Sequence, residues 1–395
     1  MDLIAEFHPG IEKIDRDAWD TCAAGRSPFT RYDFLAALEQ SGCVSEQTGW
    51  IPHHLTISLQ NSSPAENAEQ PPTLLAVCPL YVKLHSAGEY VFDQGWADAY
   101  ERAGGRYYPK LLSAIPFTPV TSCKILISPA TGEESAVTIR TTAMRAILER
   151  CDSLSFSSAH FNFLRPEDIQ AAKNNDLLLR QDQQFHWFNK GYETFGDFLA
   201  TLTSRKRKQI RKERQTVLDS DIEIRAIEGK GVSEADLDAF FQFYLDTGAR
   251  KWGHPYLNRK FFSCIRQTMP DDMLLFLCYR NDRPIAGALN FIGPDTLYGR
   301  YWGCIEDHPC LHFETCYYQA IDYAITHKLS TVEAGAQGPH KIARGYEPSR
   351  TISAHYIRDE RFRAAVDDFL KREGHQIDYE AEYLSKHLPF KKSDT

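Results

Sequence analysis

Two spacings of hydrophobic residues run through this chain, and each predicts one type of secondary structure. Apolar residues three or four positions apart predict helices, whereas short apolar or alternating runs predict strands. In the first half they predict a helix that begins at 27–29, a helix over 136–151, and strands at 54–59, 74–82, 124–127 and 153–157. The polar segment 60–73 contains three prolines and is typical of a mobile surface loop.

The same order of elements returns after about residue 185. Thr194 is expected to cap a short helix, and the patterns then predict a basic helix at 204–218, helices at 234–249, 259–269 and 313–327, and strands at 222–227, 273–280, 284–292, 296–302 and 331–334. Each half therefore combines antiparallel strands with a crossover helix and a parallel strand. We expect an α/β (α+β) fold of two domains, 1–185 and 186–395, with mixed, mostly antiparallel sheets.

The basic helix is the most one-sided stretch of the sequence. Residues 204–214 hold seven cations and one carboxylate in a protein of net charge -8. Ser204 is expected to cap the helix, and Ile210, Val217 and Leu218 to form its apolar side. Cations in the first turn oppose the helix dipole, which favours an anion site over a merely solvated face. The anion-binding candidates are Arg205, Lys206, Lys208, Arg211 and Lys212.

Two other stretches combine polar and aromatic residues in patterns that suggest binding. In 88–110, aromatic residues alternate with charges and glycines, and they either pack between the domains or line a pocket wall. The candidates there are Asp93, Trp96, Tyr107, Tyr108 and Lys110. The second stretch follows the predicted strand 331–334, and ligands often bind beyond the carboxyl ends of such strands. Its candidates are Gln337, His340, Lys341 and Arg344.

Composition and cysteine usage limit the class of protein. Hydrophobic residues make up 43% and charged residues 25%, as in ordinary soluble globular proteins. No apolar run approaches the length of a bilayer span, and the N-terminal segment lacks the core of a signal peptide. We therefore expect no membrane span and a cytoplasmic location.

Ten cysteines occur without a CxxC pair, which argues against a disulfide scaffold. One cluster would suit zinc by ligand type but not by spacing, and it leaves a zinc hydrolase as a minor alternative. It consists of Cys304, His308, Cys310, His312 and Cys316. We expect no metal site.

Several blocks of the sequence resemble the FemAB-like family of predicted N-acyltransferases. They are residues 203–214, 311–318 and 335–341, with 88–110 and 115–119 similar to N-terminal blocks of that family. The resemblance implies two tandem GNAT-like domains with the reaction centre in a cleft between or beside them. It also implies peptidoglycan-related transfer of an acyl group from acyl-coenzyme A, or an aminoacyl group from tRNA, to a small-molecule or peptide amine. Acyl-CoA or aminoacyl-tRNA would be a co-substrate, with no tightly bound cofactor.

Acyl transfer to an amine needs a base and donors that face the developing oxyanion, but no covalent nucleophile. His340 and Glu314 are the candidate bases because each ends a predicted element on the same edge of the second sheet. The alternatives are that Glu314 stabilises its helix terminus and that His340 satisfies a loop carbonyl. A different class, a non-catalytic RNA-binding module, would need only the basic helix, but a pI near 6.0 is unusual for such proteins.

Overall fold

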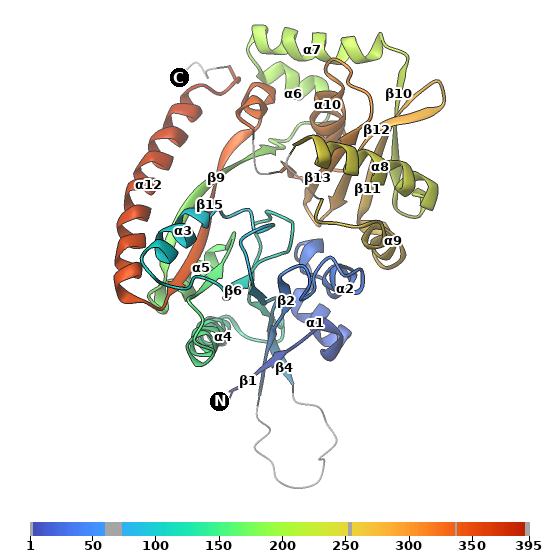
Figure 1. The fold of residues 1–395 in the computed structure, drawn as a ribbon. Coiled ribbons are helices and arrows are strands. Elements are labelled where there is room, and N and C mark those ends of the chain that lie inside the picture. The colour runs from blue at the N-terminus through green and yellow to red at the C-terminus, as the bar shows by residue number, and fades with distance from the viewer. Residues whose placement is uncertain (1–2, 60–72, 252–254, 336–337, 392–395) are drawn as a thin grey trace. The chain divides into compact units, whose positions relative to one another are not determined.

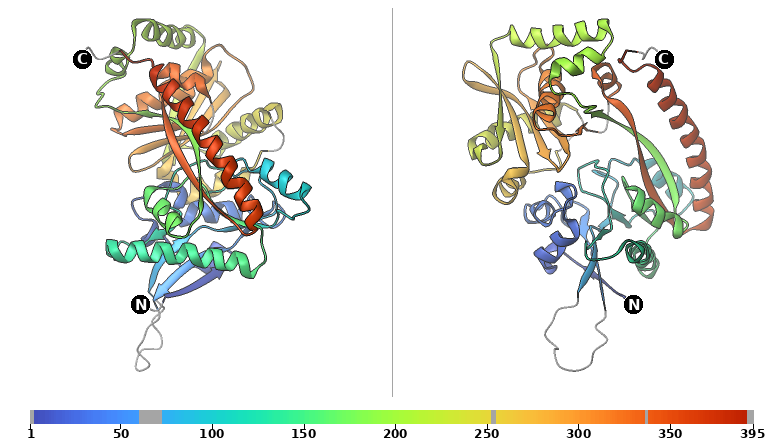
Figure 2. Two further views of the ribbon diagram at one scale, coloured as in Figure 1. Left: turned by 90° about the vertical axis from the view of Figure 1, so that its left-hand side faces the viewer. Right: turned by 180° about the vertical axis from the view of Figure 1, so that it is seen from behind.

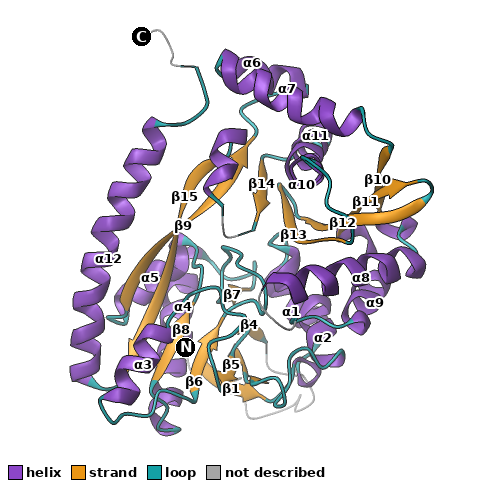
Figure 3. Ribbon diagram, turned by 45° about the horizontal axis from the view of Figure 1, so that its top comes forward, coloured by secondary structure: helices purple, strands orange, loops and turns teal. Residues whose placement is uncertain are grey.

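A computed structural model describes residues 3–59, 73–251, 255–335 and 338–391 (Figure 1). Only Thr73 of the predicted loop 60–73 is described, and the predicted site residue Gln337 lies outside the described residues. Within them the fold is mixed α/β, and most strand pairs are antiparallel (Figure 3). The α-helices and strands are β1 (Leu3–His8), α1 (Arg16–Ala23), α2 (Tyr32–Gln40), β2 (Trp50–Pro52), β3 (His54–Leu59), β4 (Leu74–Cys78), β5 (Tyr81–Lys83), α3 (Gln94–Arg102), β6 (Lys110–Ser113), β7 (Leu126–Ile127), α4 (Glu133–Ser153), β8 (Ser158–Phe161), α5 (Pro166–Asn174), β9 (Leu178–Phe188), α6 (Phe195–Thr201), α7 (Ser204–Leu218), β10 (Ile222–Glu228), α8 (Glu234–Lys251), α9 (Arg259–Thr268), β11 (Met273–Arg280), β12 (Arg283–Ile292), β13 (Thr296–Cys304), α10 (Leu311–Phe313), α11 (Gln319–Thr326), β14 (Thr331–Ala334), β15 (Glu347–Ile357) and α12 (Glu360–Lys386).

The strands form two sheets, and the chain forms two compact units. One sheet has the order β1-β3-β4-β7, and the other has the order β10-β11-β12-β13-β14-β9-β15-β8-β6-β5-β2. Strands β9 and β15 lie side by side (Figure 2). The first unit comprises Met1–Asp182 and Thr351–Ile377, and the second comprises Gln183–Arg350 and Asp378–Thr395. By this division Thr351–Ile377 belongs to the first unit, whereas the predicted boundary includes it in the domain 186–395.

The first unit is built around α4 and the strands on which it packs. Ile139, Ala143, Ile147 and Cys151 repeat every fourth residue, which places them on one face of the helix, and all four are buried. Burial of such a stripe supplies on the order of 2 kcal/mol for each large aliphatic side chain. In the same unit β6 and β8 form a parallel pair.

The second unit has its own core and its own parallel strand pair. Strands β10 to β13 are antiparallel neighbours, and β14 then runs parallel to β13 from Thr331 to Ala334. Helix α11 packs its buried Ile321 and Ile325 into the core formed with β11 and β14. Between α10 and α11 the chain forms a single π-helical segment, η5 (Glu314–Tyr318), and such segments occur often at functional sites.

Some predicted boundaries were wrong for identifiable reasons. The strand expected at 153–157 begins at Ser158, because α4 continues to Ser153 and Ser155 then adopts a left-handed turn with φ 55°. The strand expected at 74–82 is two strands, β4 and β5, which belong to different sheets. The helix expected to begin at 27–29 is a 3₁₀ turn, Pro28–Thr30, followed by α2.

The basic helix α7 also differs from expectation at both ends. Its N-cap residue is Thr203, which makes no side-chain capping bond, so Ser204 is the first helical residue rather than the cap. Ile210 and Val217 are buried as expected, but Leu218 is 73% exposed because it lies at the last position of the helix, off the packed face. No helix in the described residues is long and apolar enough to cross a bilayer.

Candidate functional site

A pocket of about 90 Å³ lies in the second unit, where the parallel pairing of β13 with β14 ends. The last paired residues are Gly299 and Ala334, and both line the pocket. Strands β12 and β13, α10, η5 and the residue after β14 supply the rest of the wall. The lining residues are Ala288, Leu289, Asn290, Gly299, Arg300, Tyr301, Trp302, His312, Cys316, Tyr317, Ala334 and Gly335.

A β-bulge shapes one wall of this pocket. Leu289 pairs with Tyr301 and Asn290 pairs with Gly299, so Arg300 is the extra residue on β13. A bulge interrupts the ladder of hydrogen bonds and is frequent beside active sites. The Arg300 side chain is turned to Glu333 on β14, with Nη2 2.7 Å from Oε2. This ion pair is almost fully buried.

Tyr317 connects the pocket to a histidine outside it. Tyr317 is buried in η5 and lines the pocket, and its hydroxyl lies 2.8 Å from Nε2 of His340. His340 is exposed and belongs to the 3₁₀ segment η6 (Pro339–Arg344). The hydroxyl and the imidazole therefore form a hydrogen-bonded path from the pocket wall to solvent.

Glu314, the other predicted base, is held in an ion pair. Its carboxylate accepts hydrogen bonds from Arg214 on α7, at 3.0 Å from Nη2, and from Gln319, at 2.8 Å from Nε2. Burial raises the pKa of Glu314, and the neighbouring Arg214 opposes that rise. Its contacts are those of a residue that anchors α7 to η5.

Two of the predicted anion-binding residues are buried. Arg344 donates to Glu213 on α7, at 2.9 Å from Oε2, and to the carbonyl of His340, and its guanidinium lies 3.4 Å from the centre of the Phe313 ring. Lys341 is 1% exposed and donates to the carbonyl of Gly335 at 2.7 Å. Burial, with Arg300 nearby, lowers the pKa of Lys341 to about 7.

The remaining basic residues lie on the outer side of α7. Arg205, Lys208, Arg211 and Lys212 are exposed, and within the described part of the chain none of them forms an ion pair. The inner side carries Glu213 and Arg214, whose partners are in η5, α11 and η6. Lys206 is half-buried beside Gln209. Helix α7 therefore has a packed, charge-compensated side and an uncompensated cationic side.

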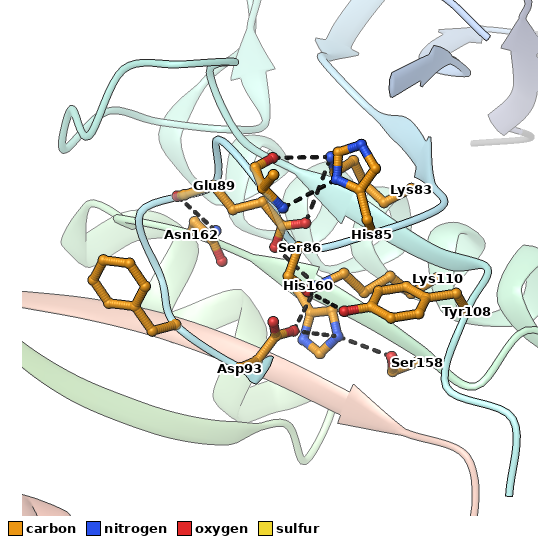
Figure 4. A network of polar contacts seen from close by, with 12 residues as sticks. Lys83, His85, Ser86, Glu89, Asp93, Tyr108, Lys110, Ser158, His160 and Asn162 are labelled. Carbon is orange, nitrogen blue, oxygen red and sulfur yellow. Dashed lines mark hydrogen bonds and ion pairs between the residues drawn. The ribbon is translucent and has the colours of Figure 1, made fainter. Parts of the chain in front are cut away.

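The residues predicted from 88–110 gather in the first unit, inside a buried polar network (Figure 4). Lys110 Nζ lies 2.5 Å from Asp93 Oδ2 and 2.8 Å from Glu89 Oε2. The Tyr107 hydroxyl donates to Asp93 at 2.7 Å, and the Tyr108 hydroxyl lies 2.7 Å from Ser86 Oγ, which also accepts from Lys110.

Two histidines extend the network. His160 Nδ1 lies 2.7 Å from His355 Nδ1, and His160 Nε2 lies 2.8 Å from Ser158 Oγ. The Trp96 ring packs edge-on against His355. Burial lowers the pKa of His160 to about 3, and Lys110 adds to that effect. The same burial raises the pKa of Glu89 to about 7.

Comparison with known proteins assigns the chain to a family. The FemAB-like family model, described as peptidoglycan biosynthesis/recognition, matches residues 10–392. The chain belongs to the FemAB-like family. A search of curated proteins found no match for this FemAB-like chain.

Solved structures share the fold at low identity. The structure of FemX superposes with a TM-score of 0.51 and 12% identity, over 93% of this chain and 100% of that chain. The C-terminal domain of a putative lysylphosphatidylglycerol synthetase from Agrobacterium fabrum gives 0.52 and 8%, over 91% and 95%. At such identities the likeness concerns the fold alone.

The structure places the predicted site residues of this FemAB-like protein in three groups. His340, Lys341, Arg344 and Glu314 lie beside the pocket of the second unit, and the cations of α7 form the second group. The third group is the network around Asp93 and Lys110 in the first unit. The sequence did not indicate Asn290, Gly299, Arg300 and Tyr317, because only the strand register and the packing of η5 bring these residues to one pocket.

The cysteine and histidine cluster is spread over several elements. His312 and Cys316 line the pocket, Cys304 ends β13, and His308 lies 2.9 Å from Glu306. In the described residues no three or more His, Cys, Asp or Glu side chains are placed to hold a metal ion together. The arrangement gives the zinc alternative no geometric support.

Proposed function

We propose that this FemAB-like protein is an N-acyltransferase that moves an acyl or aminoacyl group from an activated donor to an amine, by direct attack in the pocket of the second unit. The family described for peptidoglycan biosynthesis/recognition, and the fold shared with FemX and a lysylphosphatidylglycerol synthetase domain, support this reaction class. The observation that carries the proposal is Tyr317, whose hydroxyl joins the pocket wall to His340 at 2.8 Å.

The chemistry follows from that contact. As the amine nitrogen bonds to the carbonyl carbon, its proton passes to the Tyr317 oxygen, and Tyr317 donates its own proton to His340 Nε2. The leaving oxygen or sulfur of the donor departs with the electron pair of the broken bond. Because His340 is exposed, it returns the proton to solvent. Backbone N–H groups at the Arg300 bulge are the nearest candidates for stabilising the oxyanion.

The exposed cations of helix α7 favour an anionic acyl donor. Its exposed cations, Arg205, Lys208, Arg211 and Lys212, offer uncompensated charge to the phosphates of acyl-coenzyme A or of an aminoacyl-tRNA. The acceptor in this proposal is a small-molecule or peptide amine. The tandem GNAT-like domains at 1–185 and 186–395, and the cytoplasmic location, remain predictions.

The test is a transfer assay on the full chain with two labelled donors, acetyl-coenzyme A and alanyl-tRNA, and a lysine-containing pentapeptide precursor of peptidoglycan as acceptor. The proposal predicts labelled amide product with one of the donors. Retention of label on the protein after denaturation would contradict direct attack. No product with either donor, together with tight binding of uncharged tRNA, would instead favour the alternative of a non-catalytic RNA-binding module based on α7.

A further inference from the structure

The pocket contains a buried amide whose oxygen receives no hydrogen bond from the described residues. Asn290 is 1% exposed, and its Nδ2 donates to the carbonyls of Leu274 at 3.3 Å and Ala288 at 3.2 Å. Carbonyl oxygens only accept, so the nitrogen must face them and Oδ1 must face away. Within the described residues no hydrogen bond reaches Oδ1. Asn290 lines the pocket, so Oδ1 is available to accept a hydrogen bond from a group bound there.

Gly299 keeps the space over this oxygen open. Gly299 pairs with Asn290 across the two strands, and both residues line the pocket. A Cβ at position 299 would lie 3.2 Å from Asn290 Oδ1 and 3.4 Å from the carbonyl oxygen of Glu333. Any side chain at this position would therefore crowd Oδ1. The open volume of about 90 Å³ admits a small group but not a whole cofactor.

The lining of the pocket selects the state of that group. Glu333 compensates the charge of Arg300, and none of the described lining residues is a carboxylate that could hold an ammonium group. Desolvation without a counter-ion disfavours the charged form and lowers the pKa of a bound amine. A neutral primary amine keeps N–H donors for Oδ1 and a free lone pair for attack. The rings of Trp302 and Tyr317 offer apolar contact on the remaining walls.

We infer that Asn290 Oδ1 and the open space at Gly299 form the subsite for the acceptor, a small primary amine that binds uncharged and donates one N–H to Oδ1. The inference rests on the proposed function and names the part of the site that receives the nucleophile. Asn290 then directs the amine lone pair away from Oδ1, and Tyr317 lies on the same pocket wall to take the proton.

Binding of small probes to the full chain tests this subsite without catalysis. The chain is labelled with 5-fluorotryptophan, and the resonance of Trp302, one of six tryptophans, is assigned with Trp302→Phe. Glycinamide is titrated at pH 9, above the ordinary α-amino pKa of about 8. Propionamide, which has CH₃ in place of the amine, is the matched probe. We expect a saturable shift of the Trp302 resonance, with glycinamide at least tenfold tighter than propionamide and weaker binding at pH 6.

Variants show whether the preference for glycinamide over propionamide arises at Asn290 and Gly299. Gly299→Ala and Asn290→Leu should each abolish the preference for glycinamide, whereas Gly231→Ala, in a 3₁₀ turn of the same unit, should retain it. Gly299→Ala leaves the Asn290 hydrogen bonds in place. If Asn290→Leu does not fold, Gly299→Ala alone tests whether the preference for glycinamide depends on this subsite. Equal binding of the two probes, no response at Trp302, or a preference that survives Gly299→Ala would each overturn the inference.

One further experiment distinguishes an acceptor amine from the amino group of an aminoacyl donor. A non-hydrolysable alanyl-adenosine amide carries the amino group of an aminoacyl donor. If the inference holds, it leaves the affinity for glycinamide unchanged; competition with glycinamide would assign the pocket to the donor and overturn the acceptor assignment. Loss of glycinamide binding alongside intact transfer would refute this subsite alone, whereas intact binding without transfer from any donor would refute the proposed function.

Discussion

Arg214 on α7 and Glu314 at the start of η5 form an ion pair, with Nη2 3.0 Å from Oε1, in which Glu314 is buried and Arg214 is 22% exposed. Arg214 has a second partner in Asp322 at 2.9 Å. Glu213, the neighbouring residue on α7, accepts from Arg344 of η6. Adjacent residues of one helix thus hold both segments that flank the pocket.

Glu314→Gln should therefore act mainly on the free energy of unfolding and have a smaller effect on the rate of acyl transfer. The variant removes the negative charge opposite Arg214 and leaves Asp322 as its carboxylate partner, so we expect a loss of about 1–3 kcal/mol in the free energy of unfolding. Urea unfolding measures the loss, and a double-mutant cycle with Arg214→Gln isolates the pair. Glu223→Gln, which removes an exposed carboxylate, should change nothing measurable. A stable Glu314→Gln protein with abolished turnover would restore Glu314 as the base.

The outer side of α7 should control binding of anions. Replacing Arg205, Lys208 and Arg211 with Gln removes three uncompensated cations, so we expect weaker binding of tRNA with little change in melting temperature. The slope of log affinity against log salt concentration should fall by about 2. A control with the same change in net charge is Arg102, Lys173 and Arg361 to Gln, all exposed in the first unit. Equal loss in both triple variants would assign the effect to net charge rather than to α7.

The buried histidines of the first unit should make the fold sensitive to acid. The pKa of His160 is lowered to about 3 by burial, so the folded state binds this proton less tightly than the unfolded state. His160 therefore contributes stability above its ordinary pKa of about 6.5, and that contribution is lost as pH falls from there towards 3. His355, lowered by burial and by His160, acts in the same direction.

Thermal unfolding of wild type and His160→Gln between pH 7.5 and 4 measures this dependence. We expect the wild-type melting temperature to fall more steeply than that of the variant, because the variant lacks the histidine whose pKa is lowered by folding. Glu89, whose pKa is raised to about 7, opposes the fall equally in both proteins. His387→Gln, which changes an exposed histidine, should follow the wild-type profile. Parallel profiles for wild type and His160→Gln would refute the assignment to His160.

Elements with a clear local pattern were predicted more accurately than strands whose partners are distant in the sequence. Strands β11 and β12 are nearly continuous apolar runs and were found within a residue of their observed bounds. Strand β9 was missed because its centre, Arg180–Gln184, is polar, and β15 was missed because polar residues interrupt it. Both are strands whose partners are distant in sequence, so no local pattern reports the pairing.

The candidate site shows the same limit. Asp93, Tyr107 and Lys110 were grouped from a local run of polar and aromatic residues, and the structure brings them into direct contact. Their partners His160 and His355 come from β8 and β15, and no local pattern joins those strands to residues 88–110. Asn290 and Gly299 face each other only because of the bulge at Arg300, which cannot be read from spacing.

Acyl transfer in this pocket depends on the proton path from Tyr317 to His340. Single-turnover transfer with the active donor should fall about a hundredfold or more in Tyr317→Phe and in His340→Ala, with donor affinity unchanged, because each removes one step of proton transfer. Cys316→Ser, in the wall of the same pocket, should retain turnover within a few-fold. Full turnover in both Tyr317→Phe and His340→Ala, or its loss in a folded Cys316→Ser protein, would contradict direct amine attack at this pocket.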